Sequence, residues 1–462
     1  MTSPAVTVRG LPGPPPLPAL GNLPDLLRDG RPHRRLEDWC DRYGLTYQIT
    51  TPAGPAVVTA DPLLVDHIMR ERPRLFRRDQ QITRIIEEVG VHGVFTAEGD
   101  RWRRARRITS QGLNPAHLAG YFPALVTGAQ RLARRWAPGG SVAVLPDLRR
   151  YTLDVTFALA TGHDLNSLEQ PKGRLATLLP MLLPAINRRM SVPVPYWRWV
   201  RLPADRRLAT MLSELDSLIR IRTVSARERV AAGATPATVL ESLVATPDGE
   251  EPFTQAELFG NVLTMLLAGE DTTASAVAWA LHHLAADLPA QRRVRAEAVV
   301  ALGDGSPIRA AEVRGLALAG AAVREALRLH PVASLTVVEA AEETELPGGD
   351  GPPLRVGPGT PIWTLMTYGS RRDSRRFPDP GRFRPDRWLD PVTVRQGDLR
   401  HLPFGAGPRA CPGRGLAMLE ATLLVALIVR DFDLAPDPAS RPRERVAFTV
   451  SPAGLRVRLT RR

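Results

Sequence analysis

Apolar and polar residues alternate in two short segments near the N-terminus. Residues 46–49 and 56–59 change character at every second position, and a Pro-Ala-Gly-Pro segment separates them. This pattern is typical of a β-hairpin. Asp61 followed by Pro62 has the residue types of a helix N-cap and first helical position, so we predict a helix that continues to Met69.

The longest helical pattern lies in the middle of the chain. From about Arg101 to Leu329, apolar residues recur three and four positions apart, as they do on one face of a helix. Thr254 and Glu257 have the spacing of a capping box and open a periodic segment that reaches about Leu284. A helix of roughly 30 residues is about 45 Å long.

The C-terminal third changes character after this segment. A second helix is predicted over 310–330, because Pro331 stops it. Short strand-like segments follow, and then a stretch rich in Arg, Asp and Pro at about 370–400 that we expect to be irregular. A last helix is predicted over 413–430.

The N-terminal segment is rich in proline. Residues 4–24 contain seven prolines, which favours an extended arm over residues 1–30. Residues 31–462 show no internal repeat and no interdomain linker, so we expect one large domain there. The predicted fold class is mainly α with a minor β part.

Composition narrows the class of protein. The chain has 462 residues, of which 44% are hydrophobic and 24% charged, and this excludes disorder, collagen and coiled coil as descriptions of the whole chain. The two cysteines, Cys40 and Cys411, lie too far apart in the sequence for a Cys-x-x-Cys zinc site. The N-terminus lacks a signal-peptide pattern and no apolar run approaches the roughly 20 residues of a membrane span, so we expect a cytoplasmic protein.

The chain is strongly basic, with a formal net charge of +13. All but one of its 61 basic residues are arginines. Such lopsided usage is typical of a G+C-rich genome, and a basic surface for an acidic partner is the alternative that stays open. We find no helix-turn-helix, zinc finger or basic stretch interleaved with aromatic residues, which argues against nucleic-acid binding.

The segment around Cys411 carries the most specific chemistry. It reads Phe-Gly-Ala-Gly-Pro-Arg-Ala-Cys-Pro-Gly over 404–413. Glycines let a backbone approach a flat group closely, and a cysteine before a helix is stabilised as a thiolate. Taken alone, a cysteine in this setting is more often a buried structural cysteine in a turn.

The whole segment resembles the haem-ligand signature of the cytochrome P450 family, Phe-x-x-Gly-x-Arg-x-Cys-x-Gly. The resemblance implies that the Cys411 thiolate is the proximal ligand of iron in haem b, and that Arg409 binds a haem propionate. Phe404 would pack near the thiolate. Gly405 lies within the signature, and Gly413 is its last fixed position.

A second resemblance lies within the long predicted helix. Ala-Gly-Glu-Asp-Thr-Thr over 268–273 resembles the family's oxygen-binding groove. By this resemblance, Ala268 and Gly269 make room for dioxygen where the helix is locally distorted. Thr272 hydrogen-bonds dioxygen at the haem, Asp271 relays protons, and Glu270 has a lesser catalytic role.

Further motifs extend the resemblance along most of the chain. Trp102 and Arg106 resemble the family's Trp-x-x-x-Arg helix and would bind a propionate. Glu325 and Arg328 resemble its buried Glu-x-x-Arg pair, and Arg382 would complete that structural triad. One departure is Val337-Val338, where the family often carries another propionate-binding arginine.

The resemblance implies a fold and a function. The fold is a single large triangular domain with a long central helix crossing the haem. The function is that of a bacterial monooxygenase that uses O2 to hydroxylate or epoxidise a hydrophobic small molecule, such as a terpenoid, polyketide or fatty-acid-like compound of specialised metabolism. A non-oxygenating haem protein is the alternative, but it has no need for the acid–threonine pair.

The resemblance also implies electron-transfer partners. Since no flavin or iron–sulfur segment follows Cys411, electrons from NAD(P)H would come through a separate ferredoxin and ferredoxin reductase. We expect an acidic ferredoxin near Arg103, Arg104, Arg107 and Arg414, and a monomeric enzyme.

Overall fold

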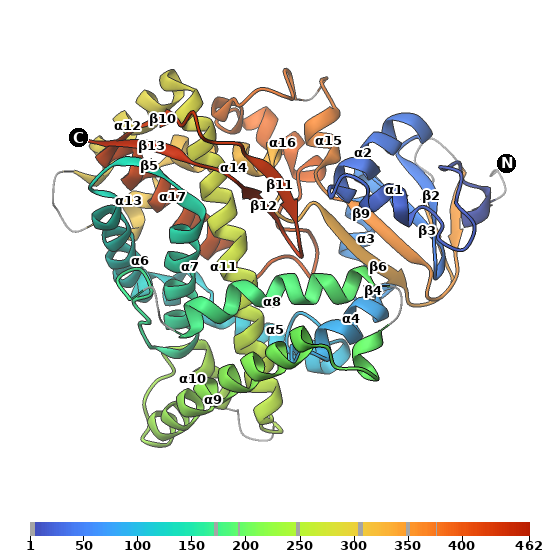
Figure 1. Cartoon of the computed structure of the whole chain (residues 1–462), viewed down its shortest axis with the longest axis horizontal. Helices are drawn as coiled ribbons and strands as arrows, with labels where there is room; N and C mark the ends of the chain where they lie inside the picture. The colour runs from blue at the N-terminus through green and yellow to red at the C-terminus, as the bar shows by residue number, and fades with distance from the viewer. Residues whose placement is uncertain are drawn as a thin grey trace. The chain divides into compact units, whose positions relative to one another are not determined.

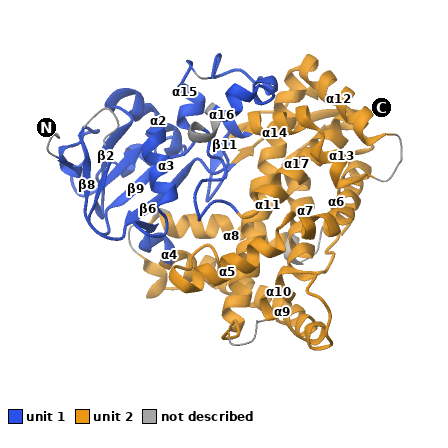
Figure 2. Ribbon diagram, turned by 180° about the vertical axis from the view of Figure 1, so that it is seen from behind, with its two compact units in different colours: residues 1–83, 327–411, 444–450 blue, residues 84–326, 412–443, 451–462 orange. Residues whose placement is uncertain are grey.

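The computed structural model describes residues 5–170, 174–192, 195–245, 250–303, 308–347, 352–375 and 377–462. The first four residues of the predicted N-terminal arm lie outside this part of the chain. The described residues divide into two compact units (Figure 2). Unit 1 comprises residues 1–83, 327–411 and 444–450, and unit 2 comprises residues 84–326, 412–443 and 451–462.

Unit 1 is built on β-sheets. The order β2-β3-β9-β6-β4 forms a five-stranded sheet, in which β3 and β9 are parallel and the other neighbours are antiparallel. The strands of the unit are β1 (Val6–Thr7), β2 (Thr46–Thr51), β3 (Gly54–Thr59), β4 (Phe76–Arg78), β6 (Leu335–Ala340), β7 (Thr344–Leu346), β8 (Leu354–Val356) and β9 (Pro361–Leu365). The predicted hairpin is confirmed as β2 and β3, which pair from Thr46 with Thr59 to Thr51 with Gly54.

Both faces of this sheet are covered. Neighbouring residues of β3 point to opposite faces, so Val57 joins one buried hydrophobic cluster and Val58 joins another. The helices of the unit are α1 (Leu23–Leu27), α2 (Pro32–Tyr43), α3 (Pro62–Arg70), α15 (Tyr368–Arg372) and α16 (Pro391–Arg400), with short 3-10 turns η1 (Val8–Gly10) and η3 (Pro385–Trp388). The predicted helix at Asp61 is confirmed as α3, because the Asp61 carboxylate accepts hydrogen bonds from the first free N–H groups of that helix.

The proline-rich segment is held by backbone contacts. The N–H of Gln48 donates to the carbonyl of Pro12 over 2.9 Å, and the N–H of Asn22 donates to that of Thr50 over 2.7 Å. β1 pairs with β8 in parallel. These bonds lay the segment along β2 and β8.

The stretch at 370–400 is more regular than we predicted. It contains α15, η3 and α16 among its described residues. The Asp390 carboxylate accepts from the N–H groups of Val392 and Thr393, each over 3.1 Å, and so caps α16 at Pro391. The expectation of an irregular segment was therefore wrong for these helices, because it gave the prolines more weight than the cap.

Unit 2 is mainly helical. Its helices are α5 (Gly99–Gly112), α6 (Pro115–Trp136), α7 (Val144–Thr161), α8 (Arg174–Ser191), α9 (Pro203–Ala231), α10 (Val239–Val244), α11 (Gln255–Ala286), α12 (Leu288–Leu302), α13 (Ala310–Arg314) and α17 (Arg414–Asp431), with the 3-10 turn η2 (Tyr196–Arg198). Strands β10 (Phe432–Pro436), β13 (Val457–Arg461) and β5 (Gly140–Val142) form a small antiparallel sheet. Four elements lie where the chain passes between the units: α4 (Gln80–Glu87), α14 (Ala317–Leu329), β11 (Arg443–Val446) and β12 (Val450–Ala453).

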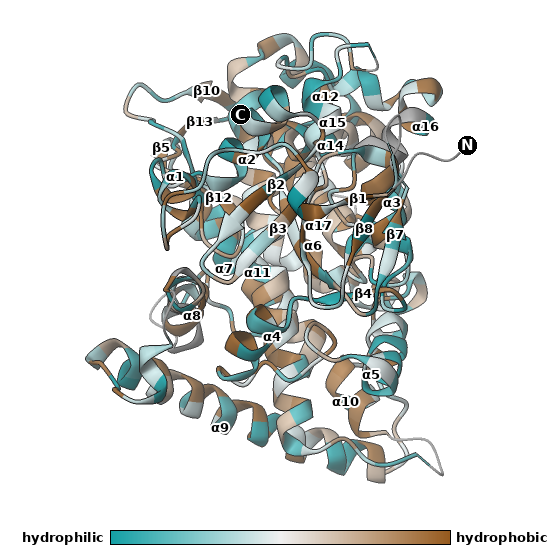
Figure 3. Cartoon of the chain, turned by 90° about the vertical axis from the view of Figure 1, so that its right-hand side faces the viewer, coloured by the Kyte–Doolittle hydropathy of each residue, from teal (hydrophilic) through white to brown (hydrophobic). Residues whose placement is uncertain are grey.

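The centre of unit 2 is α11, which packs against α7, α9, α10, α12 and α17 (Figure 1). The predicted capping box is confirmed, since the Thr254 side chain accepts from the N–H of Glu257 and the Glu257 side chain accepts from that of Thr254. At the surface, α9 alternates between hydrophilic and hydrophobic residues along its length (Figure 3). In the described part of the chain, none of the helices combines the length and apolar character that crossing a bilayer requires.

The single helix predicted over 310–330 was wrong in one respect. The chain breaks between α13 and α14 at Gly315 and Leu316. The Glu297 carboxylate accepts from the N–H groups of Leu318 over 2.8 Å and Ala319 over 2.9 Å, so a side chain of α12 supplies the cap that starts α14. Sequence periodicity carries no signal of a cap from another helix.

Candidate functional site

Cys411 lies in a tight turn three residues before α17. Its side chain is exposed and is not part of a disulfide. Its N–H donates to the carbonyl of Phe404 over 2.8 Å, and the N–H of Ala410 donates to the carbonyl of Gly407 over 3.0 Å. These bonds fold the segment back on itself and leave the sulfur at the surface of the turn.

Two glycines shape this turn. Gly405 has a φ of 68° and Gly407 a φ of 67°, a left-handed conformation that glycine adopts without strain. A Cβ atom on Gly407 would lie 2.5 Å from the carbonyl oxygen of Met69 and 2.6 Å from the Cα of Arg70. Gly407 therefore lets the turn lie directly against the end of α3.

The other residues predicted to bind the cofactor are placed as follows. Phe404 and Arg409 are half-buried in the turn of Cys411, and Gly413 is the N-cap of α17. On α5, Trp102 is buried and Arg106 follows one turn later, half-buried. The spacing of four residues puts Trp102 and Arg106 on the same helix face. Their roles toward a haem stay predictions.

One face of α11 is open, although the helix is otherwise buried. Between Leu258 and Leu281, every residue is buried except Met265, Ala268, Gly269 and Thr272. Positions spaced by three, four and seven residues lie on one face of a helix. Three of the predicted groove residues thus share an open face, and Met265 extends it by one turn.

The groove residues also have structural contacts. The Thr272 hydroxyl donates to the carbonyl of Ala268 over 2.5 Å, the bond to the preceding turn that such side chains make in helices. A Cβ atom on Gly269 would lie 2.5 Å from the Thr156 hydroxyl oxygen of α7. Gly269 is therefore required where α7 approaches α11, and α11 runs as an uninterrupted α-helix through the segment where we expected a local distortion.

Asp271 is buried and held by an arginine of α7. The Arg149 guanidinium contacts the Asp271 Oδ1 atom over 2.7 Å from Nε and over 2.5 Å from a terminal nitrogen. The side chain of Arg149 keeps 29% of its surface exposed and that of Asp271 keeps 6%. The pair therefore connects a buried carboxylate to the protein surface. The sequence analysis missed Arg149, because 122 residues separate the two in the chain.

Glu270 is buried on the side of α11 away from the open face. Its pKa is raised to about 8, mainly by burial and also by the Asp271 charge, while Arg149 opposes both effects. An acid with such a pKa holds its proton at neutral pH. The segment therefore places a protonated acid next to a carboxyl group that an arginine holds.

The predicted Glu-x-x-Arg pair lies at the end of α14. Glu325 and Arg328 are both fully buried. Arg328 donates to the carbonyls of Ser370 over 2.9 Å, Pro380 over 2.7 Å and Arg382 over 3.2 Å. Arg328 thus contacts the backbone of Arg382, whose own side chain is exposed.

The basic residues of α5 are partly used within unit 2. Arg104 lies 3.2 Å from a Glu250 carboxylate oxygen and stacks over the Phe253 ring, and Arg107 also pairs with Glu250. Arg103 pairs with Asp100, and both side chains are mainly exposed. The arginines expected to attract a ferredoxin therefore differ in how freely they face solvent.

Each of these segments fits a haem. Iron accepts a cysteine thiolate as a ligand, and the Cys411 side chain is exposed in a turn made compact by glycines. The open face of α11 carries the small side chain of Ala268, which leaves space beside it for a flat ring system and a small gas molecule.

Comparison with known proteins gives consistent matches. Residues 11–456 match the model of the family Cytochrome P450. A self-sufficient cytochrome P450 monooxygenase of Penicillium expansum is 29% identical over 469 residues, which cover 98% of this chain and 43% of that protein. Cyclooctatin synthase of Streptomyces melanosporofaciens is 29% identical over 404 residues, which cover 86% of this chain and 85% of that protein. The chain thus spans less than half the length of the self-sufficient relatives.

Proposed function

Because the chain belongs to the cytochrome P450 family, we propose that it is a haem-thiolate monooxygenase that uses O2 to oxidise a hydrophobic small molecule. The family and the mainly α fold class agree with what the sequence predicted. The observation that carries the proposal is the exposed Cys411 side chain, which is outside any disulfide, in its glycine-shaped turn. A single soft ligand presented in this way would suit a haem iron.

We assign the remaining cofactor contacts by the same motifs. Arg409, Trp102 and Arg106 would hold the propionates, and Phe404 would shield the thiolate. A haem bound through Cys411 supplies the oxygen activation and the oxidation of the substrate.

The residues of α11 would control proton supply. The Arg149 guanidinium holds one carboxylate oxygen of Asp271 and reaches the surface, so Asp271 is placed to take up protons from solvent. The Thr272 oxygen keeps its lone pairs available while its hydrogen is bonded to Ala268, so Thr272 can accept a hydrogen bond from a water molecule or a protonated ligand on the open face. Glu270 would store a proton next to Asp271.

We infer the substrate class from the open face of α11 and from one of the relatives. Met265 and Ala268 offer apolar contact on α11. Cyclooctatin synthase, one of the relatives, comes from a Streptomyces. Both support hydroxylation or epoxidation of a terpenoid, polyketide or fatty-acid-like compound as a tailoring step in bacterial specialised metabolism.

The electrons would come from NAD(P)H through a ferredoxin and its reductase. The exposed Arg103 and Arg414 support an acidic partner near α5 and the start of α17. The self-sufficient relatives show that the electron source can differ among related proteins.

The reduced carbon monoxide difference spectrum tests the proposal. We expect the strongly red-shifted Soret band of thiolate-ligated haem in the purified protein and its complete loss in Cys411→Ala. Cys40→Ala is the matched control, because Cys40 is the other free cysteine and is buried in unit 1. An unshifted band in the unaltered protein, or a shifted band that survives in Cys411→Ala, would overturn the assignment.

A further inference from the structure

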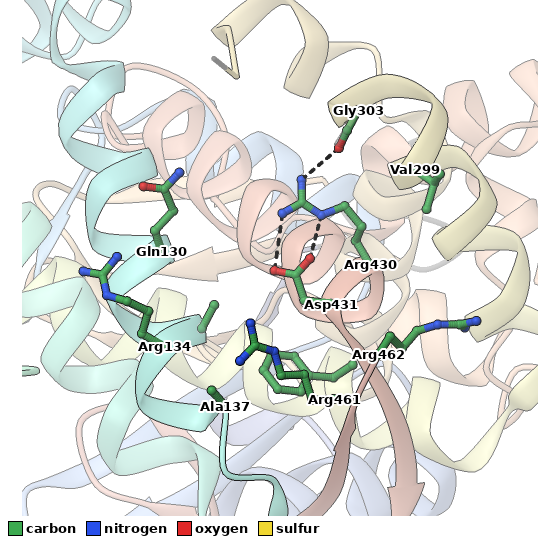
Figure 4. A pocket seen from close by; sticks show the side chains of 11 residues that line it. Gln130, Arg134, Ala137, Val299, Gly303, Arg430, Asp431, Arg461 and Arg462 are labelled. Carbon is green, nitrogen blue, oxygen red and sulfur yellow. Dashed lines mark hydrogen bonds and ion pairs between the residues drawn. The ribbon is translucent and has the colours of Figure 1, made fainter. Parts of the chain in front are cut away.

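A pocket of about 560 Å³ lies in unit 2, away from the residues assigned above. The last two turns of α6, the ends of α12 and α17, and the end of β13 form its walls (Figure 4). Its side chains include four arginines, Arg134, Arg430, Arg461 and Arg462, and one carboxylate, Asp431. None of these residues belongs to the proposed oxidation site.

The four arginines are neutralised to different degrees. Arg430 is fully engaged, because its guanidinium contacts both Asp431 carboxylate oxygens, over 2.6 and 3.3 Å. Arg134 makes one long contact of 3.4 Å, to Glu169, and Arg462 makes one of the same length, to Asp433. In both pairs, the arginine and its acidic partner are each about half exposed or more. Such contacts exchange readily with solvent and ions.

Arg461 has no ion pair or side-chain hydrogen bond in the described part of the chain. Figure 4 shows its guanidinium between Gln130 and Arg134 on one side and the Arg430–Asp431 pair on the other. The pocket therefore centres on an unneutralised cation flanked by weakly held ones.

Helix ends explain some of these arginines but not Arg461. α6, α12 and α17 end at Trp136, Leu302 and Asp431, and arginines in a last turn offset the negative end of the helix dipole. Arg134 and Arg430 are such residues, and Arg430 also donates to the Gly303 carbonyl over 3.4 Å. Arg461 lies on a strand, so helix capping gives no reason for it.

We propose that this pocket binds an organic phosphate ester, with the phosphate group on Arg461 and Arg134 and the amide of Gln130 beside it. A phosphate carries close to two negative charges and three acceptor oxygens, which suit several guanidinium forks better than a single carboxylate does. The walls also include Ala133, Ala137, Val299 and Phe432. These apolar side chains and the volume of the pocket leave room for the organic part of the ester.

Binding to the haem-loaded full chain tests this site. Isothermal titration with phenyl phosphate, inorganic phosphate and benzoate would be carried out at one fixed ionic strength. We expect one saturable site for phenyl phosphate, with affinity at least fivefold higher than for either of the other two probes. The double variant Arg134→Gln/Arg461→Gln should weaken phenyl phosphate binding at least tenfold.

The matched control is Arg443→Gln/Arg458→Gln, which removes two exposed arginines of unit 2 that do not line the pocket. It should leave the affinity within twofold. Equal losses in both double variants, or no saturable binding, would overturn the site. Tighter binding of benzoate or inorganic phosphate would overturn the ligand class. The reduced carbon monoxide band should be intact in both variants, so this result is independent of the proposed oxidation.

Discussion

The Cys411 turn and the acid–threonine segment of α11 carry the two halves of the proposed chemistry, but they are built in different ways. The turn takes its shape within ten residues, from backbone hydrogen bonds and glycines with positive φ, and only its packing against α3 involves distant residues. The α11 segment depends on Arg149 and Thr156 of α7, more than a hundred residues away in the chain. The backbone of this segment is that of an ordinary buried helix, so only its side-chain contacts mark it as a functional acid pair.

The two segments would therefore lose their function in different ways. A local turn fails when its backbone conformation is blocked. A buried carboxylate loses its function when a distant partner is removed, even though the helix that carries it stays intact. Substitutions that block the turn and substitutions that remove the distant partner should therefore have different effects.

The largest effect is expected from Asp271→Asn. This change keeps the shape of the side chain but removes the carboxylate that Arg149 holds, so proton supply fails. We expect turnover to fall about 100-fold, in the range for loss of a general acid–base group. Steady-state turnover with a hydrophobic substrate measures it, and the reduced carbon monoxide band should be unchanged. Turnover within threefold of the unaltered enzyme would contradict the assignment.

Gly407→Ala breaks the local half instead. The new Cβ would lie 2.5 Å from the Met69 carbonyl oxygen, in a left-handed backbone conformation. We expect the free energy of unfolding to fall by about 2–3 kcal/mol, together with the fraction of thiolate-ligated haem. Urea unfolding measures the first and the carbon monoxide spectrum the second.

Gly357→Ala is the control for that change. Gly357 also lies in unit 1, but its added Cβ would meet open space and its φ is not positive. Its stability should stay within about 0.5 kcal/mol of the unaltered protein. If Gly407→Ala were tolerated as well as Gly357→Ala, the turn would not need a glycine at position 407.

Arg149→Gln removes the distant partner from the α11 half. The Asp271 carboxylate then stays buried without its cation, and we expect turnover to fall about tenfold, which corresponds to about 1.4 kcal/mol. Arg150→Gln is a close match, because Arg150 is the next residue of α7, is equally exposed, and pairs with Asp147 instead. A similar loss of turnover in both variants would mean that Arg149 acts only through the stability of α7.

The smallest effect concerns Glu270. Its pKa of about 8 in the folded chain lies above its ordinary value of 4.5, so the folded state binds a proton that the unfolded state releases. Its contribution to stability is therefore complete below about pH 4.5 and is lost as the pH rises toward 8. Glu270→Gln has no such proton. From pH 6 to pH 7, the stability of this variant relative to the unaltered protein should rise by about 1 kcal/mol.

Urea unfolding at the two pH values measures this difference. Asp216→Asn is the control, since Asp216 is a half-buried acid of α9 that pairs with Arg220. A stability difference for Glu270→Gln that does not change with pH would show that Glu270 is ionised in the folded chain.

The sequence predicted the elements whose signals are local. The hairpin of β2 and β3, the capped start of α3 and the capping box of α11 each depend on a few adjacent residues, and all were confirmed. The break at Gly315 was missed because its cap, Glu297, belongs to α12. The helix α16 was missed because proline content outweighed the cap supplied by Asp390.

The sequence by itself determined the family and the mainly α fold class, and it singled out Cys411, Asp271 and Thr272, whose roles stay predictions. Motifs of this kind are readable because neighbouring residues impose the geometry. Only the tertiary structure decided which face of α11 is open, that Arg149 holds Asp271, and that Gly269 accommodates Thr156. These contacts join residues far apart in the chain, and such packing has no signal in the spacing of residues along a single sequence.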